Sequence, residues 1–377
     1  MSTPSSFVSG ARAPADGEDR GPSATNGSTG WQRPFSRVAK FLRRHPILFL
    51  ALLTPGIPEY LSGSSPLSNL VLDPGWFLLG LGFNLGMYVP GALLIREAQV
   101  RWDKGWATVL ALGAAYAIVE EGIGLSTMFN PKASALGSEG GYGHFLGVNW
   151  VWIPEVMMIH MIFSIGVPLL LFAYVFPEFR GKSLLSRRGI FTAAAVLAVD
   201  IGVLAVFVSR LTGYWMGDSV LLGAVLAVAA ICTLAHRLPK DLLHPRPGRP
   251  RRGALGFAVV GVSFYPGLIV VLAVLEHYRV PAFLVVASIP IFCGVYLWWL
   301  LGNAGTVGHD RQLLAFALGI ILPIIVIGAI SQILVPIVLV ADLLAILLFR
   351  HLWRKFPDSA AASTMVDPPP GASASVG

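Results

Sequence analysis

Ten runs of mostly apolar residues, each close to the length of a membrane-spanning helix, dominate this 377-residue sequence. A helix needs about twenty apolar residues to cross the hydrocarbon core of a bilayer. The runs lie at 45–62, 75–97, 105–128, 150–176, 189–209, 218–236, 254–275, 281–302, 312–330 and 332–350. Only 12% of the residues are charged and the mean hydropathy is +0.71, whereas about a quarter of a soluble domain is charged. The sequence therefore predicts an all-α, polytopic transmembrane helix bundle of about ten spans.

The basic residues of the loops alternate between the two sides of the membrane when all ten runs are taken as spans. Cytoplasmic loops of membrane proteins carry an excess of Lys and Arg. With the N-terminus inside, 24 of the 27 Lys and Arg residues fall on the cytoplasmic side, and the outer side receives Lys132, Arg210 and Arg279. Removing one span would destroy this alternation. Both termini are therefore predicted to be cytoplasmic, in a multi-pass protein of the inner (plasma) membrane.

Composition divides the chain into five parts. Residues 1–40 and 357–377 are rich in Ser, Gly and Pro, so they are predicted to be disordered cytoplasmic tails. The basic loop 237–253 separates a six-helix region at 41–236, which holds the polar site, from a four-helix region at 254–350. The basic residues of 237–252 are interpreted as a topology signal, or as a contact for anionic lipid. No nucleic-acid partner is predicted, and the oligomeric state is left open.

Two neighbouring runs carry ionisable residues at similar membrane depth. Glu120 and Glu121 lie in 105–128, and His160 lies in 150–176. At 1.5 Å per residue, the two acids are roughly 23 Å along an outward-running helix, and His160 is roughly 15 Å below the outer surface. The short connection between the runs favours direct packing of the two helices. Because ionisable groups in apolar helices are costly unless they are paired or hydrated, these three residues are the predicted catalytic core.

Adjacent helical residues point about 100° apart, so only one of the two glutamates is expected to face His160. A Glu–His hydrogen bond that only fastens two helices is the alternative interpretation. Lone acids in later runs, Asp200 and Asp342, are interpreted as hydrogen-bonded structural acids or as proton carriers. Supporting or rim groups are predicted on the runs 75–97 and 150–176 and at the break in the first run caused by Pro55 and Pro58. Others are predicted in the glycine-rich connection 131–149, a candidate lid. The supporting or rim groups are Asn84, Glu59, His144, Asn149, Glu155 and Ser164.

A carboxylate and a histidine beside a water-filled cavity can carry out hydrolysis with the carboxylate as general base. Glu and His are also zinc ligands, but the HExxH spacing of zinc proteases is absent from the sequence. No cofactor is therefore predicted, with a metal ion at Glu121 and His160 as the alternative. The two cysteines, Cys232 and Cys293, lie inside apolar runs and give no pattern for a disulfide or a metal site.

The adjacent pair Glu120–Glu121 on one membrane helix, followed by a lone His160 on the next, resembles the CPBP family of intramembrane proteases, the CAAX-protease and bacteriocin-processing family. This resemblance implies water activated by a glutamate and an intermediate stabilised by the histidine. The family's arginine after the glutamate pair has no counterpart in EEGIGL. The segments TPGIPEYLSGSSPL, LLIREAQVRW, EEGIGLSTMFNP and GVNWVW also resemble a group of uncharacterised prokaryotic polytopic membrane proteins, a likeness that implies no activity.

Two other functions fit the same residues. A proton-coupled small-molecule transporter would use the broken first helix, Asn84 and the buried acids, with Asp200 or Asp342 in the pathway. A non-catalytic assembly or anchor protein would use the polar connection as a surface for a partner. A protease predicts a laterally open cavity in which Glu120 or Glu121 faces His160 across a water-sized gap. A transporter predicts a central cavity lined from both halves, including Asp200 or Asp342, and an anchor predicts no such cavity.

Overall fold

The computed structural model describes residues 40–133, 142–332 and 336–356. The predicted tails at 1–39 and 357–377, and residues 134–141 of the candidate lid, lie outside this range. The chain divides into two compact units, Met1–Arg44 and His45–Gly377. Residues 40–44 of the first unit are helical, and all that follows concerns the second unit.

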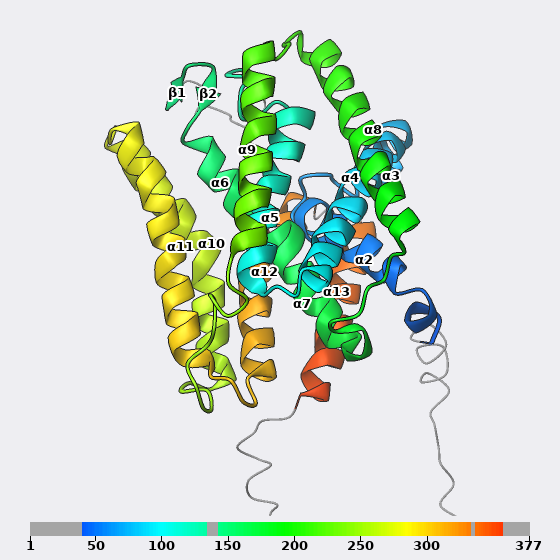
Figure 1. Cartoon of the computed structure of the whole chain (residues 1–377), viewed down its shortest axis with the longest axis vertical. Helices are drawn as coiled ribbons and strands as arrows, with labels where there is room; N and C mark the ends of the chain where they lie inside the picture. The colour runs from blue at the N-terminus through cyan, green and yellow to red at the C-terminus, as the bar shows by residue number, and fades with distance from the viewer. Residues whose placement is uncertain (1–39, 134–141, 333–335, 357–377) are drawn as a thin grey trace, which may run out of the picture. The chain divides into compact units, whose positions relative to one another are not determined.

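The unit His45–Gly377 is built almost entirely of helices (Figure 1). Its first part contains α2 (Pro46–Pro55), η1 (Gly56–Leu61), α3 (Asn69–Leu72), α4 (Pro74–Arg101), α5 (Trp106–Ala117), η2 (Ile118–Gly124), α6 (Trp152–Ile159), η4 (His160–Gly166), α7 (Val167–Val175) and η5 (Pro177–Phe179). Its second part contains α8 (Arg187–Thr212), α9 (Asp218–Arg237), α10 (Ala254–His277), α11 (Ala282–Ala304), α12 (Asp310–Ser331) and α13 (Pro336–Lys355). A small antiparallel hairpin, β1 (His144–Phe145) and β2 (Val148–Asn149), pairs His144 with Asn149.

Within the described residues, eight helical segments are long and apolar enough to cross a membrane. They are α4, α5 continued by η2, α6 continued through η4 and α7, and each of α8 to α12. The chain is therefore an integral membrane protein with an all-α fold, as the apolar runs predicted. A helix occupies each of the ten predicted runs, but Pro46–Leu61 is shorter than the eight spans. Ten full spans and cytoplasmic termini stay predictions.

The helices that carry the candidate site are the most enclosed. In the most apolar window of each span, 67% of residues are buried for Trp106–Gly124 and for Trp152–Val175, against 11% for α8, α9 and α11. Helix α5 packs against η4 and α9, while α8 packs against α4. Helix α8 and the α10–α11 pair lie on opposite flanks of the unit (Figure 1). The apolar outer faces of these flanking helices are suited to lipid, and the polar residues of 105–128 and 150–176 are shielded from it.

The first apolar segment breaks where its prolines predict. Helix α2 ends at Pro55, the π-helical turn η1 contains Pro58, and a turn over 62–68 follows. The Ser65 side chain accepts a hydrogen bond from Asn84, which is about 15 Å along α4 at 1.5 Å per residue. The turn therefore lies at the depth of an apolar span, where its backbone polar groups need partners within the protein. The amide of Ser65 donates to the carbonyl of Glu59 at 3.0 Å, and that of Ser68 donates to Gln332 Oε1 at 3.4 Å.

A buried ion pair closes the opposite end of α4. The Glu97 side chain is 2% exposed and accepts from Arg96 at 3.3 Å and from Arg101 at 3.0 Å. Its Oε1 also accepts from the amide of Leu184 at 2.6 Å. Arg96 donates to the carbonyls of Phe179 and Lys182 at 2.7 and 2.8 Å. Arg96 and Glu97 thus clamp the connection between α7 and α8, and both side chains are buried.

Candidate functional site

Three π-helical turns carry the candidate site. Glu59 lies on η1, Glu120 and Glu121 lie on η2, and His160 begins η4. In η2 the amide of Leu125 bonds to the carbonyl of Glu120, five residues earlier, and in η4 the amide of Val167 bonds to the carbonyl of Ile162 in the same way. A π-helical turn inserts one extra residue into a helix and often occurs at functional sites. Each turn changes the direction in which its ionisable side chains project.

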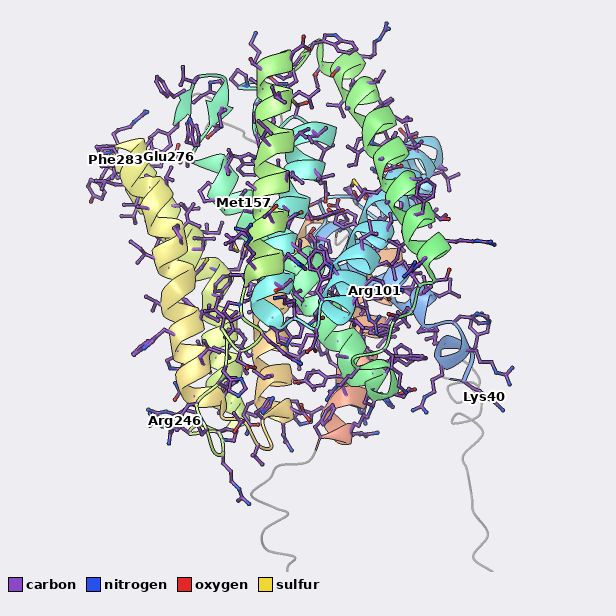
Figure 2. The ribbon with its side chains drawn as sticks, in the orientation of Figure 1. Lys40, Arg101, Met157, Arg246, Glu276 and Phe283 are labelled. Atoms are coloured by element: carbon purple, nitrogen blue, oxygen red, sulfur yellow. The ribbon has the colours of Figure 1, made fainter. Side chains whose placement is uncertain are left out.

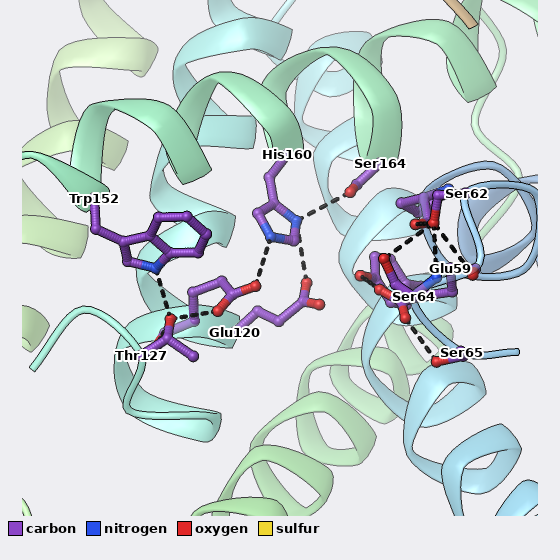
Figure 3. Close-up of polar contacts among 12 residues, drawn as sticks. Glu59, Ser62, Ser64, Ser65, Glu120, Thr127, Trp152, His160 and Ser164 are labelled. Atoms are coloured by element: carbon purple, nitrogen blue, oxygen red, sulfur yellow. Dashed lines mark hydrogen bonds and ion pairs between the residues drawn. The ribbon is translucent and has the colours of Figure 1, made fainter. Parts of the chain in front are cut away.

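His160 lies between the two adjacent glutamates. Its Nδ1 is 3.3 Å from Glu120 Oε2, and its Nε2 is 3.5 Å from Glu121 Oε1. Ser164, one turn along on η4, is 3.0 Å from Nδ1 (Figure 3). The prediction that only one glutamate faces His160 is wrong. The two carboxylates approach opposite edges of one imidazole ring, so they do not need to converge on one point, and η2 departs from the 100° spacing of an α-helix.

The two glutamates differ in their exposure. The Glu120 side chain is 1% exposed and the His160 side chain 3%, whereas that of Glu121 is 15% exposed. Glu121 also accepts a hydrogen bond from the hydroxyl of Thr127. Trp152 donates its indole N–H to Thr127 Oγ1 at 3.0 Å, as Figure 3 shows. Glu120 is therefore the enclosed partner of the histidine, and Glu121 is the accessible one.

Two buried tyrosines enclose the imidazole. The ring of Tyr88 stacks on that of His160 with centroids 6.3 Å apart, and the ring of Tyr116 meets it edge-on at 5.8 Å. Both tyrosines are at most 4% exposed. Within the described part of the chain, the Tyr116 hydroxyl has no hydrogen-bond partner. The aromatic rings exclude water from the faces of His160 and leave its edge to the carboxylates.

A second group of polar residues connects to the first through Tyr88. The Tyr88 hydroxyl donates to Glu59 Oε1 at 2.6 Å, and Ser65 donates to Glu59 Oε2 at 2.7 Å. Asn84 donates to Ser65 Oγ and to Tyr60, each at 3.2 Å. We call Glu59, Tyr88, Glu120, Glu121 and His160 the glutamate–histidine cluster. It draws residues from η1, α4, η2 and η4.

The predicted rim residues separate into two groups. Glu59 belongs to the cluster, Ser164 contacts it at His160, and Asn84 is connected to it through Ser65, which donates to Glu59. His144 instead lies in the hairpin, with its Nε2 3.0 Å from the carbonyl of Phe129. Asn149 accepts from the amide of Trp152 at 3.0 Å and so positions the start of α6. These two residues shape the connection above the cluster and have no described contact with His160.

Glu155 also points elsewhere. It is half-buried and interacts electrostatically with Tyr265 of α10. Residues five apart on a helix point about 140° apart, so Glu155 and His160 project from different faces. Asp200 of α8 packs against Gly86 of α4 and acts electrostatically on Tyr116.

Sequence reasoning missed several members of this network. Tyr88, Tyr116, Ser65 and Thr127 are not among the site residues predicted from the sequence. Tyr116 lies four residues before Glu120, the spacing that places side chains on one helical face. A search for hydroxyls at this spacing from the buried acids would have found it. Ser65 and Thr127 lie in turns, where helical spacing gives no signal.

Comparison of the chain with protein-family models, curated proteins and solved structures finds no match. The resemblance to CPBP proteases therefore stays a prediction. Among the described residues, no group of three or more His, Cys, Asp and Glu side chains has the arrangement of a metal site. The candidate metal site at Glu121 and His160 likewise stays a prediction. What the site can do is argued below from its geometry.

Proposed function

We propose that this integral membrane protein is a membrane-embedded hydrolase in which Glu121 is the general base, His160 stabilises the intermediate and Glu120 orients the imidazole. One observation carries the proposal. The two ring nitrogens of His160 face different carboxylates, one enclosed at 1% exposure and one at 15%. Hydrolases built on histidine use this division, since one nitrogen is held by an orienting carboxylate and the other faces the reacting groups.

The enclosed side of the ring fixes its orientation. The hydrogen-bond partner of Nδ1 is the Ser164 hydroxyl at 3.0 Å, and Glu120 Oε2 lies 3.3 Å from Nδ1 as a charged neighbour that makes no hydrogen bond within the described residues. The rings of Tyr88 and Tyr116 restrict rotation of the imidazole. A histidine held by several partners in a site of low dielectric loses little energy to reorganisation during a reaction. These contacts support a preorganised site.

The proposed reaction takes place at the accessible side of the ring, where Glu121 faces Nε2. The separation of 3.5 Å between Glu121 Oε1 and His160 Nε2 lies beyond the usual range for a strong hydrogen bond. In the proposed reaction, Glu121 takes a proton from water, and the water oxygen attacks the carbonyl carbon of the substrate. His160 donates a hydrogen bond from its Nε2–H to the oxyanion of the tetrahedral intermediate. Collapse of the intermediate then breaks the bond between the carbonyl carbon and the leaving group, and the protonated Glu121 returns its proton to the leaving group, which regenerates the carboxylate. The CPBP resemblance implies the same division of roles.

Hydrolysis by the full-length protein in liposomes tests this proposal. The probes are fluorogenic peptides and esters that partition into the bilayer. The E121Q variant is expected to lose about 10²- to 10⁴-fold in rate, the usual contribution of a general base. D218N removes an exposed carboxylate at the start of α9 and is expected to retain the wild-type rate. The proposal is contradicted if E121Q hydrolyses the probes at the wild-type rate. It is also contradicted if the wild-type protein hydrolyses none of the probes faster than empty liposomes do.

A second function, proton-coupled transport, is favoured by the position of Glu59. This acid lies on the broken first segment, and its hydrogen bond to Tyr88 connects it to the ring stacked on His160. Broken helices and buried acids near mid-membrane are features of ion-coupled carriers. The non-catalytic anchor function has no comparable support, because several costly buried charges converge on one histidine.

Proton movement distinguishes the transporter from the hydrolase. Liposomes that contain a trapped pH-sensitive dye, together with the wild-type protein, would be screened with small solutes for acidification that depends on the solute. Transport predicts a signal that is lost in E59Q and retained in D218N. Hydrolysis in the absence of any solute-dependent proton flux assigns the cluster to hydrolysis.

A further inference from the structure

A cavity of about 390 Å³ lies at the end of the bundle remote from the β1–β2 hairpin. It is bounded by the last turns of α4 and α7, the first turns of α5 and α12, and the loop that follows α9. The alternation of loop charge assigns this end to the cytoplasm. The cavity is separate from the glutamate–histidine cluster, since none of the five cluster residues lines it.

Positive charge predominates in the lining of the cavity. Four cationic side chains, Arg96, Lys104, Arg180 and Lys240, meet two acidic ones, Asp103 and Asp310. Lys240 pairs with Asp103 at 2.6 Å. This hydrogen bond raises the pKa of the Lys240 ammonium above its ordinary value, so Lys240 is charged at neutral pH.

Two of the cations are held by groups that carry no net charge. Lys104 donates to the carbonyl of Leu238 at 2.9 Å, and Arg180 donates through Nε to the carbonyl of Ala173 at 2.9 Å. Arg180 also lies over the ring of Tyr174, with 5.4 Å between the guanidinium and the ring centroid. Their positive charge is therefore not neutralised by these contacts and is suited to an anion in the cavity.

Apolar side chains form part of the cavity lining. Leu169, Leu170, Phe172 and Leu313 contribute to the lining, and they belong to spans that cross the membrane. Trp106, which is 37% exposed, lies at the beginning of α5 beside the cations, where aromatic residues typically mark the lipid–water interface. A cavity lined by both cations and apolar side chains fits an amphipathic anion better than a free one.

We propose that this cavity binds the phosphate of an anionic phospholipid from the cytoplasmic leaflet, with Lys104 and Arg180 as its principal contacts and the acyl chains against Leu169 and Leu313. Basic pockets between transmembrane helices on the cytoplasmic side bind such headgroups. Of the basic loop 237–252, whose residues were candidate lipid contacts from the sequence, Lys240 alone lines the cavity. The lipid site is thus formed mainly by helix ends.

Lipid binding to the full-length protein in neutral detergent tests the proposal. Native mass spectrometry would be used to titrate dioleoylphosphatidylglycerol against dioleoylphosphatidylcholine. One saturable site for phosphatidylglycerol is expected, with no equivalent site for phosphatidylcholine. The K104Q/R180Q variant is expected to bind phosphatidylglycerol about 10- to 30-fold more weakly, because each basic residue near a membrane changes the affinity about fivefold or slightly less.

The matched control is R251Q/R252Q, which removes two exposed charges from the same basic side outside the cavity. The R251Q/R252Q variant is expected to bind phosphatidylglycerol with wild-type affinity. The same affinity is expected for K104R/R180K, which keeps both charges and so shows whether substitution at these positions disrupts the fold of the cavity. Equal loss in R251Q/R252Q, or wild-type binding in K104Q/R180Q, overturns the proposal. Inorganic phosphate is the third probe, and displacement of the lipid by millimolar phosphate would assign the cavity to a free anion.

Discussion

Glu120 and Glu121 are neighbours in sequence with different surroundings. Glu120 is 1% exposed and paired with His160, so its replacement by alanine leaves a buried imidazole without its closest carboxylate. Breaking a buried ion pair by removal of one partner costs about 3–5 kcal/mol. We expect Glu120→Ala to lower the free energy of unfolding by this amount, measured by denaturant unfolding in mixed micelles.

The matched variant is Glu121→Ala. Its side chain is 15% exposed and its second partner is Thr127, so water can replace part of the lost interaction. A clearly smaller loss of stability is expected for Glu121→Ala than for Glu120→Ala. Equal losses, or a larger loss for Glu121→Ala, would contradict the assignment of Glu120 as the enclosed partner.

The residues that meet at the site were predictable only in part. The cost of burying ionisable side chains and the short connection between the two runs were sufficient to predict that Glu120, Glu121 and His160 lie close together. The contact of both glutamates with one ring was not predictable, because α-helical geometry was assumed where η2 and η4 are π-helical. His144 and Asn149 were selected for their polarity near the helix ends, and their hairpin contacts depend on local pairing that residue type does not specify.

At the scale of elements, the broken first segment is held against α12 by a close backbone approach. A Cβ atom added to Gly328 would collide with the carbonyl oxygen of Leu61. We expect Gly328→Ala to destabilise the protein by about 1–3 kcal/mol, the usual cost of overpacking, as measured by thermal unfolding.

Gly223→Ala on α9 is the control, since nothing lies within 4 Å of its added Cβ. It should be neutral or stabilising by up to about 1 kcal/mol. The same effect at both positions would exclude the close contact.

The clamp formed by Glu97 leads to a separate prediction. Its carboxylate accepts from the amides of Leu184 and Leu185 at 2.6 and 3.3 Å. In Glu97→Ala these amides should exchange with deuterium at least about tenfold faster, since loss of such a charged hydrogen bond costs about 1.5–3 kcal/mol. Asp103→Asn breaks the exposed pair with Lys240 and should leave their exchange unchanged, because exposed pairs contribute little. Unaltered exchange in Glu97→Ala would contradict the clamp.

Most elements were predictable because long apolar runs have few alternatives to a helix in a membrane. Pro55 and Pro58 likewise predicted the break that η1 shows, since proline lacks the backbone donor that a regular helix needs. The hairpin at 144–149 was not predicted. Its strands contain two residues each, too few for an alternating pattern to be detected.

At the scale of the whole molecule, the sidedness of the helix ends is a prediction from charge. Arg246, before α10, and Glu276, near the end of α10, lie at opposite ends of the α10–α11 pair (Figure 2). The positive-inside pattern assigns Lys182 to the cytoplasm and Trp215, between α8 and α9, to the outside. Both side chains are exposed.

Single cysteines test this assignment. In a background with Cys232 and Cys293 replaced by serine, Trp215→Cys should react with a membrane-impermeant maleimide in intact cells. Lys182→Cys should react only after the cells are permeabilised. The reverse pattern would invert the topology, and reaction of both in intact cells would require a different number of spans between them.

The number of spans was less predictable than the membrane character of the chain. Hydropathy located all eight apolar spans of the described residues, but the segment Pro46–Leu61 is too short to be counted among them. Whether such a segment crosses the bilayer depends on tertiary contacts, such as those of Ser68 and Gln332, which come from residues far apart in the sequence. The burial of the site helices depends on the same long-range packing.

Solid-state ¹⁵N NMR of histidine-labelled protein in lipid tests most directly whether His160 lies between two carboxylates. The protein has eight histidines, and the signals of His160 are those lost in His160→Gln. The two ring nitrogens report their hydrogen bonds separately. Glu120→Gln is expected to shift mainly the Nδ1 signal, Glu121→Gln mainly the Nε2 signal, and Asp218→Asn neither. His160 signals that stay unchanged in both glutamate variants would contradict the site.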